Sequence, residues 1–467
     1  MSQNQAARGE LSEYGSACLW ELSGVKRLWL LQFSVIVALA GCAQQQEAMR
    51  VAPSNPVTSK IQHVVIIVQE NRSTDNLFNG LPGADTAQYG ENSKGQRIQL
   101  QPILLTGFYD MSHGHSTFDV EYANGNLNGF NLALSHCNHR GQCPAKGRRS
   151  YAFVPRTEVK PYFTMAEEYA FADRMFETDE SSSFPAHQYI LSGTSTISEG
   201  SRLRAAENPK TPAGKFTGGC SSPPGSLVAL IDPSGRENRQ MYPCFDRPAL
   251  SDLLEAKSLS WRYYQAHLGA GLWNGPDAIR HIRNSTEYHT DVVAPPSKVL
   301  TDIANGSLAD VVWVTPTQAA SDHAGNTDGS GPSWVASVVN AIGKSQYWKT
   351  TTIFVTWDDW GGWYDHVAPT QYNSFELGFR VPLIVIGPYA KKGYVSHKQH
   401  EFGSILKFVE GTFGLGSLGT TDMRSDDLSD CFDFSKAPRR FVPISAPLDA
   451  NYFLRQPISS LDPDDDY

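Results

Sequence analysis

Two short acidic turns carry the oxygen-rich side chains that could do chemistry in this chain. Glu70 and Asn71 follow one run of β-branched apolar residues, and Asp358 and Asp359 follow another. If these turns met, their three carboxylates would repel one another and rise in pKa unless a divalent cation neutralised them. A helix cap in a solvated loop would explain either turn by itself. The occurrence of both turns therefore predicts a metal site with oxygen ligands.

Three histidines in polar, glycine-rich loops form a second group of candidates. His113 and His115 lie shortly after Asp110, and His323 lies in the segment Ser-Asp-His-Ala-Gly. An imidazole titrates near neutral pH and can hold or pass a proton during catalysis. A lone loop histidine more often has a structural or exposed role, so the sequence leaves both interpretations open.

A run of serines, Ser181–Ser183, precedes Phe-Pro-Ala and His187. Serine followed by proline and helix-forming residues is typical of a helix start. A hydroxyl at this place could simply cap the helix. It could also be a nucleophile, because free backbone N–H groups and the helix dipole favour a bound phosphate.

The elements that must position these residues are short strands alternating with helices. Continuous apolar runs predict strands that are buried on both faces. Apolar residues at helical spacing predict helices over Ser333–Lys344 and Glu401–Phe413. This alternation implies an α/β fold with a mostly parallel central sheet and helices on both faces, whose ligands bind beyond the carboxyl ends of the strands. The predicted strands are His63–Val68, Val311–Val314, Thr352–Trp357 and Pro382–Gly387.

The segment at about 195–300 contains fewer such units and more Pro, Gly and Asn. We therefore expect a loop-rich insertion or cap there, within a catalytic domain over residues 60–445. Residues 446–467 are expected to form a C-terminal tail.

Composition restricts the class of protein. The 467 residues include 39 Lys+Arg and 48 Asp+Glu, for a net charge of −9, and 40% are hydrophobic. A disordered chain would hold fewer aromatic and more charged residues. The acidic balance argues against a nucleic-acid partner, because phosphate backbones select an excess of Lys and Arg.

The N-terminal segment predicts export. Lys26 and Arg27 precede the apolar run 28–40, which is too short for a comfortable membrane span and fits a secretory signal. The run ends in Leu-Ala-Gly-Cys42, which resembles the bacterial lipobox. We expect a signal segment over 1–41, with 1–24 a mis-assigned start, and a lipidated tether over 42–59. The chain would then be a periplasmic or cell-surface lipoprotein, attached to the outer membrane through Cys42; an ordinary signal peptide is the alternative.

Export also determines how the cysteines are interpreted, because an oxidising compartment favours disulfides. Two pairs close short loops, Cys137 with Cys143 and Cys220 with Cys244, which leaves Cys431 free. The alternative for the first pair is a metal site that also uses His139.

Six collinear segments together resemble a known family. They are QENRSTDNLF, DMSHGHSTFDVEYANGNLNGF, SSFPAHQYILSGT, SDHAG, TIFVTWDDWGGWYDHVAP and GFRVPLIVIGPYAKKG. The family is the bacterial phosphoesterase group of phosphatidylcholine-specific phospholipases C and a class of acid phosphatases, within the alkaline-phosphatase-like superfamily. The resemblance runs from about Lys60 to about Arg440.

The resemblance implies specific roles. Ser183 would be the nucleophile, forming a phosphoserine intermediate and contacting a divalent metal. His113 and His323 would contact phosphoryl oxygens or assist the leaving group, and His115 and His187 are weaker candidates. Hard cations such as Mg²⁺, Ca²⁺ or Mn²⁺ suit oxygen ligands, and nearby histidines would also admit Zn²⁺. The metal ligands would be Glu70, Asn71, Asp358, Asp359 and Ser183.

The segments also depart from the family pattern. Thr74 and Asn76 replace the usual Phe and His, and Ala186 replaces an Asn near the nucleophile. Ser182 replaces the Pro before the nucleophile, so Ser182 or Ser181 could be confused with Ser183. These differences concern the details of the pocket more than the chemistry.

The resemblance leaves the substrate open. Longer phospholipases of the group carry further C-terminal domains, so this chain is expected to be an exported acid phosphatase, with a phospholipase C acting on phosphatidylcholine-type phosphodiesters as the alternative. Aromatic Trp360, Trp363 and Tyr364 could stack on a choline group or belong to the core. A surface lipoprotein that binds without catalysis is a remote third hypothesis. A serine esterase is disfavoured because the sequence has no Gly-x-Ser-x-Gly segment.

Overall fold

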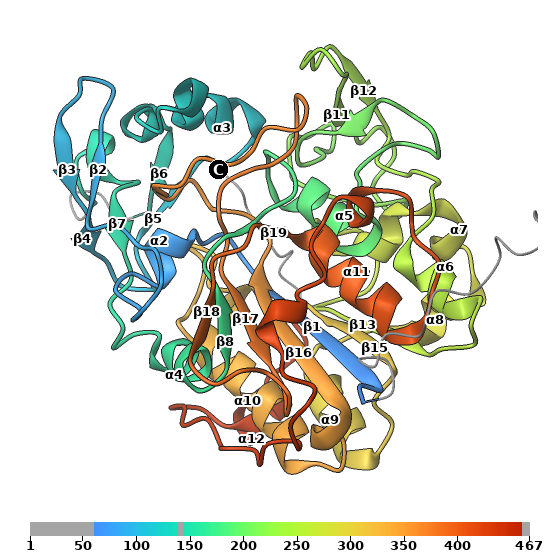
Figure 1. The fold of residues 1–467 in the computed structure, drawn as a ribbon. Helices are drawn as coiled ribbons and strands as arrows, with labels where there is room; N and C mark the ends of the chain where they lie inside the picture. Colours follow the sequence, from blue (N-terminus) through green and yellow to red (C-terminus); the bar gives the residue numbers. More distant parts are fainter. Residues whose placement is uncertain (1–59, 139–142, 460–467) are drawn as a thin grey trace, which may run out of the picture. The chain divides into compact units, whose positions relative to one another are not determined.

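An eight-stranded sheet forms the centre of the structure, a computed structural model that describes residues 60–138 and 143–459 (Figure 1). These residues belong to one compact unit, residues 55–467. The predicted signal segment and lipidated tether, Cys42 included, lie outside the described residues. Across the sheet the strands are β14 (Val292–Val293), β13 (Trp261–Tyr264), β15 (Val311–Val314), β1 (His63–Gln69), β16 (Thr351–Trp357), β17 (Leu383–Ile386), β8 (Ala170–Ala172) and β18 (Tyr394–Ser396).

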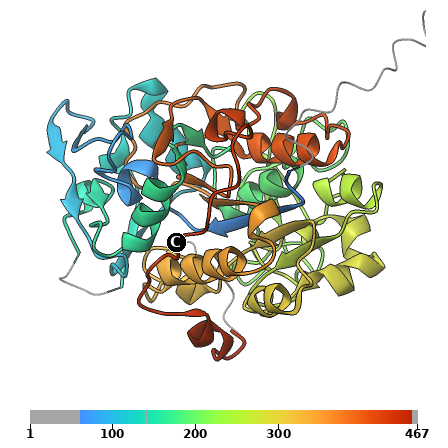
Figure 2. The ribbon, with the colours of Figure 1, turned by 60° about the horizontal axis from the view of Figure 1, so that its bottom comes forward.

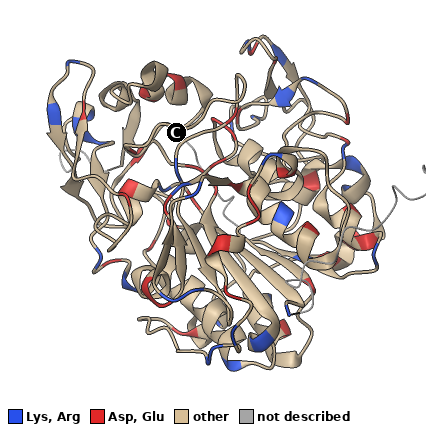
Figure 3. Ribbon diagram, in the orientation of Figure 1, with Lys and Arg blue, Asp and Glu red and all other residues tan. Residues whose placement is uncertain are grey.

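The sheet is mostly parallel, as the sequence predicts. β1 lies between β15 and β16 and runs parallel to both. β17 is the exception, because it pairs antiparallel with β16 and with β8. Every residue of β15, β16 and β17 is buried, which explains why these strands read as continuous apolar runs. Charged residues are correspondingly scarce on the central strands (Figure 3).

Helices cover both faces of the sheet, which confirms the predicted α/β fold. α9 (Lys298–Asn305) and α10 (Gly331–Lys344) lie on one face, and α5 (Ser183–Ser192) and α11 (Phe402–Phe413) lie on the other (Figure 2). α10 begins two residues before its predicted start, with a proline in its first turn. The other helices are α2 (Thr74–Leu77), α3 (His115–Tyr122), α4 (Lys160–Glu168), α6 (Leu250–Glu255), α7 (Arg280–Arg283), α8 (Thr286–Asp291) and α12 (Ala450–Leu454).

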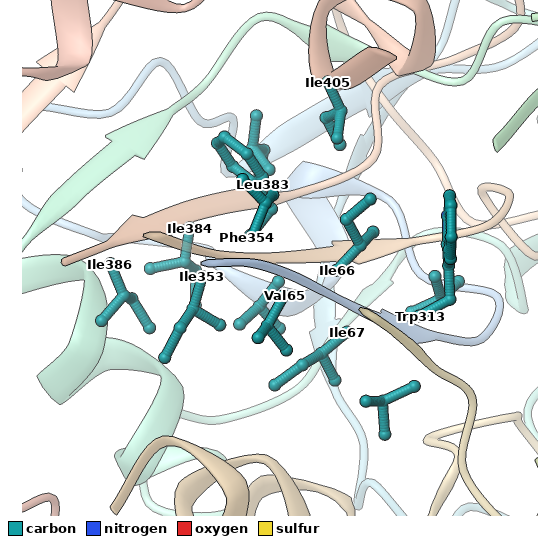
Figure 4. Packing of buried hydrophobic residues seen from close by; sticks show 14 of the residues in the cluster. Val65, Ile66, Ile67, Trp313, Ile353, Phe354, Leu383, Ile384, Ile386 and Ile405 are labelled. Carbon is teal, nitrogen blue, oxygen red and sulfur yellow. The ribbon is translucent and has the colours of Figure 1, made fainter. Parts of the chain in front are cut away.

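The core follows the alternation of side chains along the strands. On β1, Val65 and Ile67 point to one side of the sheet and Ile66 to the other (Figure 4). Ile405 of α11 lies on the side of Ile66 and Phe354, and Phe354 also contacts Phe408, with ring centroids 5.1 Å apart. Each face thus buries its own apolar layer, the arrangement that holds the strand ends in place.

The segment predicted as a cap at about 195–300 divides in two. Its first part forms a separate three-stranded sheet of β10 (Arg204–Ala205), β11 (Val228–Ile231) and β12 (Arg239–Met241). Its second part supplies β13 and β14 to the edge of the central sheet. Each of these strands is short and is flanked by irregular segments. The sequence pattern therefore does not distinguish them from the rest of the insertion. The expected C-terminal tail also contains structure, because Phe453 of α12 packs against Trp334, with ring centroids 5.3 Å apart.

Residues 86–153 form a second small subregion, which we call the β5–β6 lobe. Its strands β5 (Tyr109–Met111) and β6 (Ser135–Cys137) pair antiparallel.

No helix of the described residues is long and apolar enough to span a membrane. The remaining strands are β2 (Tyr89–Glu91), β3 (Arg97–Gln99), β4 (Gln101–Pro102), β7 (Ala152–Phe153), β9 (Met175–Phe176) and β19 (His400–Glu401).

Both predicted disulfides are present. Cys137 bonds to Cys143, and Cys220 bonds to Cys244. Cys431 is a free, buried thiol, as expected. The alternative metal site is wrong, because a disulfide uses the two thiolates that a metal would require; His139 lies outside the described residues.

Candidate active site

The start of α5 decides which serine faces the acidic turns. Ser182 is the N-cap residue, and Ser183 is the first helical residue. The hydroxyl of Ser183 donates to Asp359 Oδ2 at 3.3 Å, whereas Ser181 Oγ donates to the backbone oxygen of Ala206. Ser182 Oγ is buried with no hydrogen-bond partner among the described residues. Of the three serines, Ser183 is therefore the one placed against the carboxylates.

Strand register brings the two acidic turns together. Gln69 and Trp357, the last residues of β1 and β16, are register partners. The next residues, Glu70 and Asp358, therefore start side by side, and Asp358 N donates to Gln69 O at 3.0 Å. The two acidic turns therefore meet at the carboxyl edge of the sheet, as the sequence predicts.

Asn71 turns the chain at this edge with a left-handed backbone, φ 62°. Its N–H donates to Asp358 Oδ1 at 3.0 Å, so one turn fixes the other. Gly361 passes close above it: a Cβ on Gly361, whose φ is +64°, would lie 2.2 Å from Asn71 O. Only glycine combines this φ with this approach at low cost.

His187 completes a buried cluster with the acidic turns. Its Nε2 lies 3.3 Å from Glu70 Oε1 and 3.9 Å from Asp358 Oδ2. Its Nδ1 lies 3.2 Å from the hydroxyl of Tyr263. Burial lowers the pKa of His187 to about 4, although Asp358 opposes this shift. The ring is therefore neutral at pH 7 and can offer a lone pair to a cation.

His113 lies between the two turns. Its Nε2 is 2.8 Å from Asn71 Nδ2 and 4.0 Å from Asp359 Oδ2. Its Nδ1 is 2.8 Å from the backbone oxygen of Met111, so a proton on Nδ1 lets Nε2 accept from the Asn71 amide. That amide orientation leaves Asn71 Oδ1 buried without a hydrogen-bond partner among the described residues.

His323 joins the same site from another loop. Glu70 N donates to Ser321 O at 2.9 Å, which ties this loop to the end of β1. The His323 ring lies edge-on to that of His113, with centroids 6.1 Å apart. Asp322, between Ser321 and His323 in the chain, has a left-handed backbone with a φ of 73°. The two histidines singled out by the resemblance are thus neighbours at the site.

His115 has a different environment. Its Nε2 lies 3.4 Å from Glu180 Oε2 and its Nδ1 contacts Glu237. Its backbone N–H donates to Glu207 Oε1 at 3.1 Å. Burial by itself would lower the pKa of His115, but the contacts with Glu180 and Glu237 outweigh it and raise the pKa to about 10. We interpret His115 as a charged clamp between loops.

Two acids that the sequence analysis did not select lie beside the site. Glu177 accepts from the backbone N–H groups of Trp360 and Phe379 at 3.2 and 3.0 Å. Both carboxylate oxygens of Asp179 are buried without a hydrogen-bond partner in the described structure. Burial raises the pKa of both groups well above the usual range, and Asp359 or Asp358 adds to the shift. Their place in the sequence is a signal that could have found them, because both lie within four residues of Ser181.

A cavity of about 370 Å³ opens beside the site. Its walls come from the loop that carries His113 and from the three-stranded sheet of the insertion. Trp360 and Trp363 are fully buried and do not line it, so they belong to the core rather than to a choline site. The lining residues are Ser112, His113, Gly114, Ser116, Ser182, Glu207, Asn208, Lys210, Phe216, Ala229 and Gln240.

The donor set fits a divalent cation. Asp358 Oδ2 and Asn71 Oδ1 are buried without hydrogen bonds among the described residues, and ligand atoms of Glu70, His187 and Asp358 all lie within 4.8 Å of one another. A cation at this place would neutralise the carboxylates that the two acidic turns bury together.

Two other groups of described residues also bring ligand atoms close together, but their members already have polar partners. In one, Arg380 Nε donates to Asp365 Oδ1 at 2.7 Å. In the other, His400 Nδ1 lies 3.1 Å from Asp426 Oδ1. The groups are Asp75, Asp365 and His366, and His400, Asp430 and Cys431.

The chain is similar to known proteins over most of its length. The model of the Phosphoesterase family matches residues 61–416. Non-hemolytic phospholipase C of Burkholderia pseudomallei is 24% identical over 468 residues, covering 84% of this chain and 62% of that protein. Phospholipase C A of Mycobacterium tuberculosis is 24% identical over 463 residues, covering 86% of this chain and 83% of that protein. This chain thus spans less than two thirds of the Burkholderia relative.

Among solved structures, a protein of the alkaline phosphatase superfamily from Vibrio parahaemolyticus aligns with a TM-score of 0.36 and 12% identity, covering 80% of this chain and 71% of that one.

Proposed function

Because this chain belongs to the Phosphoesterase family, we propose that it is a metal-dependent hydrolase of phosphate esters and acts as a phospholipase C. The observation that carries the proposal is the Ser183 hydroxyl, at the first residue of α5 and 3.3 Å from Asp359 Oδ2. Relatives named phospholipase C favour a phosphodiester lipid over the monoester expected from the sequence. The cavity of about 370 Å³ leaves room for the second ester group.

The metal would be held by the oxygen-rich turns. When bound, a divalent cation would neutralise the carboxylates and lower the pKa of the nucleophilic hydroxyl. Carboxylate, amide and hydroxyl oxygens fit Mg²⁺, Ca²⁺ or Mn²⁺, and the His187 nitrogen beside Glu70 would also admit Zn²⁺. The proposed ligands are Glu70, Asn71, Ser183, Asp358 and Asp359.

The residues then have distinct tasks. Ser183 Oγ attacks phosphorus in line with the leaving oxygen, and its proton passes to Asp359 Oδ2. The bond to the diacylglycerol oxygen breaks as the serine–phosphorus bond forms, and His113 or His323, in its protonated form, gives a proton to the leaving oxygen. The N-terminal end of α5 stabilises the developing negative charge. Water then cleaves the phosphoserine, releases the phosphorylated headgroup and restores the hydroxyl.

The test compares two soluble substrates with residues 55–467. We expect p-nitrophenyl phosphorylcholine to be cleaved faster than p-nitrophenyl phosphate, and a chelator to stop cleavage. Faster cleavage of the monoester would make the chain a phosphatase, as first expected from the sequence. Cleavage of neither substrate by metal-loaded protein would favour an unusual diester or a binding protein.

We also propose that the chain is exported and lipidated at Cys42. Two disulfides within the described residues fit an oxidising compartment. Mass spectrometry of the chain expressed in a bacterial host should find a lipidated cysteine as the new N-terminus. An unmodified Cys42 in the membrane fraction would contradict the proposal.

A further inference from the structure

The β5–β6 lobe exposes large apolar side chains next to the cavity. Leu134 is 68% exposed, Leu132 57% and Phe108 41%. From Leu134 to Asn138 the burial alternates, with every second side chain exposed, as in a strand with one covered face. Leu132 lies just before this segment, at the end of η3 (Phe130–Leu132). An exposed strand position is ordinarily polar, but here it holds Leu134, with the exposed Leu132 close by.

Strand register places these residues on one surface. Ser112 N donates to Leu134 O at 3.0 Å, and Asn138 N donates to Phe108 O at 2.8 Å. These bonds extend the β5–β6 pairing at both ends, so Leu134 lies opposite Ser112 and Phe108 lies opposite Asn138. Residues directly opposite one another share a face of the ribbon. Leu134 and Phe108 therefore belong to the same exposed face.

This face continues into the active-site cavity. Ser112 lines the cavity together with His113, and His113 contacts Asn71 of the proposed metal site. Leu134 is therefore one strand pairing away from the cavity wall. A surface that contacted Leu134 would therefore lie close to the cavity.

The charge of the lobe has the opposite sign to that of the whole chain. Residues 86–153 hold six Lys or Arg and four Asp or Glu, in a chain of net charge −9. Asp110 and Glu121, two of the four acids, are buried. Lys146 and Arg148 are exposed on η4 (Lys146–Arg148), and η4 packs against η3, which carries Leu132. Figure 3 shows basic positions on the outer strands of this lobe.

We propose that this face, formed by Phe108, Leu132, Leu134, Lys146 and Arg148, docks on the surface of a phospholipid bilayer and presents the cavity to lipid headgroups. Exposed apolar side chains beside basic ones match the boundary between acyl chains and anionic headgroups. This inference rests on the proposed phospholipase C function, because a membrane-binding face beside the cavity helps an enzyme whose substrate is a lipid.

The test measures vesicle binding without turnover. Residues 55–467 carrying Ser183→Ala would be sedimented with vesicles of phosphatidylcholine and phosphatidylglycerol, and with vesicles of phosphatidylcholine alone. We expect Leu132→Ser with Leu134→Ser to weaken binding to both by about tenfold or more. Lys146→Glu with Arg148→Glu should weaken binding to the anionic vesicles alone.

A matched control removes two exposed apolar residues elsewhere. Met423 and Leu454 are 69% and 46% exposed, on η8 (Thr421–Met423) and α12. Met423→Ser with Leu454→Ser should bind vesicles like the parent. With Ser183 restored, the leucine variant should cleave p-nitrophenyl phosphorylcholine at the parent rate but cleave vesicle lipid more slowly.

The outcomes separate the two proposals. If the leucine variant binds vesicles like the parent, the docking face is wrong even where the enzyme is a phospholipase C. If the parent binds through this face yet cleaves no diester, the proposed function fails and the docking face stands. If the parent ignores vesicles and forms a dimer that the leucine substitutions dissociate in sedimentation velocity, the face contacts a second copy and the inference is overturned.

Discussion

At the scale of single residues, the site depends on which of three adjacent serines reaches the carboxylates. The sequence contains Ser181, Ser182 and Ser183 in a row and cannot rank them, because one step along the chain rotates a side chain by about a third of a helical turn. The structure separates them by the beginning of α5: Ser183 contacts Asp359 and Ser181 contacts Ala206 O.

Removing the proposed nucleophile gives the first prediction. Ser183→Ala should lower kcat/KM by a factor on the order of 10⁴ or more, because removing one member of a catalytic unit costs nearly as much activity as removing all of its members. The far-ultraviolet circular dichroism should stay unchanged. Ser181→Ala is the matched control, since its hydroxyl serves a backbone oxygen; equal losses in both variants would refute the assignment of Ser183.

A second prediction concerns the charge of His115. Its pKa of about 10 lies above the ordinary 6.5, so the folded state holds the proton more tightly than the unfolded chain. The resulting stability is complete below pH 6.5 and is lost as pH rises through about 10, at about 1.4 kcal/mol per pKa unit. Urea unfolding at several pH values should show this decline between pH 6.5 and 10, and His115→Gln should flatten it. An unchanged pH slope in the variant would contradict the clamp.

At the scale of elements, β1 and β16 do most to assemble the site. Their register places the residues after Gln69 and Trp357 side by side, so two turns nearly 290 positions apart become one cluster. The sequence predicts both strands and both turns, because burial and strand-end chemistry are local properties. It cannot show the contacts of Glu177 with Trp360 and Phe379, since those partners lie about 200 residues away.

The same limit explains what the sequence analysis missed in the fold. The antiparallel direction of β17 leaves no trace in a continuous apolar run, because such a run has the same pattern in either direction. β13 and β14 are too short to stand out from the loops around them. The start of α5, by contrast, is encoded locally by Ser-Phe-Pro and was predicted.

Gly361 provides a third prediction, at the junction of the two turns. Gly361→Ala should lower the free energy of unfolding by about 2–4 kcal/mol, since it adds a clash to the strain of a positive φ. Activity and metal content should fall with it, because Asn71 must move. Gly95→Ala isolates the strain: Gly95 has φ +69° and open space around its Cβ position. Chemical denaturation would measure both, and equal losses would show that the approach to Asn71 contributes nothing.

At the scale of the whole molecule, the cavity is built by parts that do not belong to the central sheet. The three-stranded sheet of the insertion supplies one wall, and the β5–β6 lobe supplies the other. Each of these parts carries a disulfide, Cys220–Cys244 in the insertion and Cys137–Cys143 in the lobe. We expect covalent closure to matter most where the regular sheet does not reach.

The fourth prediction follows from that arrangement. Cys220 and Cys244 are 24 positions apart, a loop length for which loss of the bond should cost about 3 kcal/mol of stability. Cys220→Ser with Cys244→Ser should also raise KM for diester substrates more than it lowers kcat, because the loosened wall contacts the substrate rather than the reacting atoms. Denaturation and steady-state kinetics would measure both effects. A fall in kcat at constant KM would show instead that the wall supports the catalytic residues directly.

The buried thiol of Cys431 can report on transient opening of the core. In residues 55–467 the two disulfides use four of the five cysteines, so Cys431 is the single group that a thiol reagent can label. It is fully shielded in the main core, and burial raises its pKa above the usual range. Labelling must therefore wait until this part of the core opens, so its rate reports how often that happens. Metal or substrate that tightens the site would appear as slower labelling at a cysteine that touches neither.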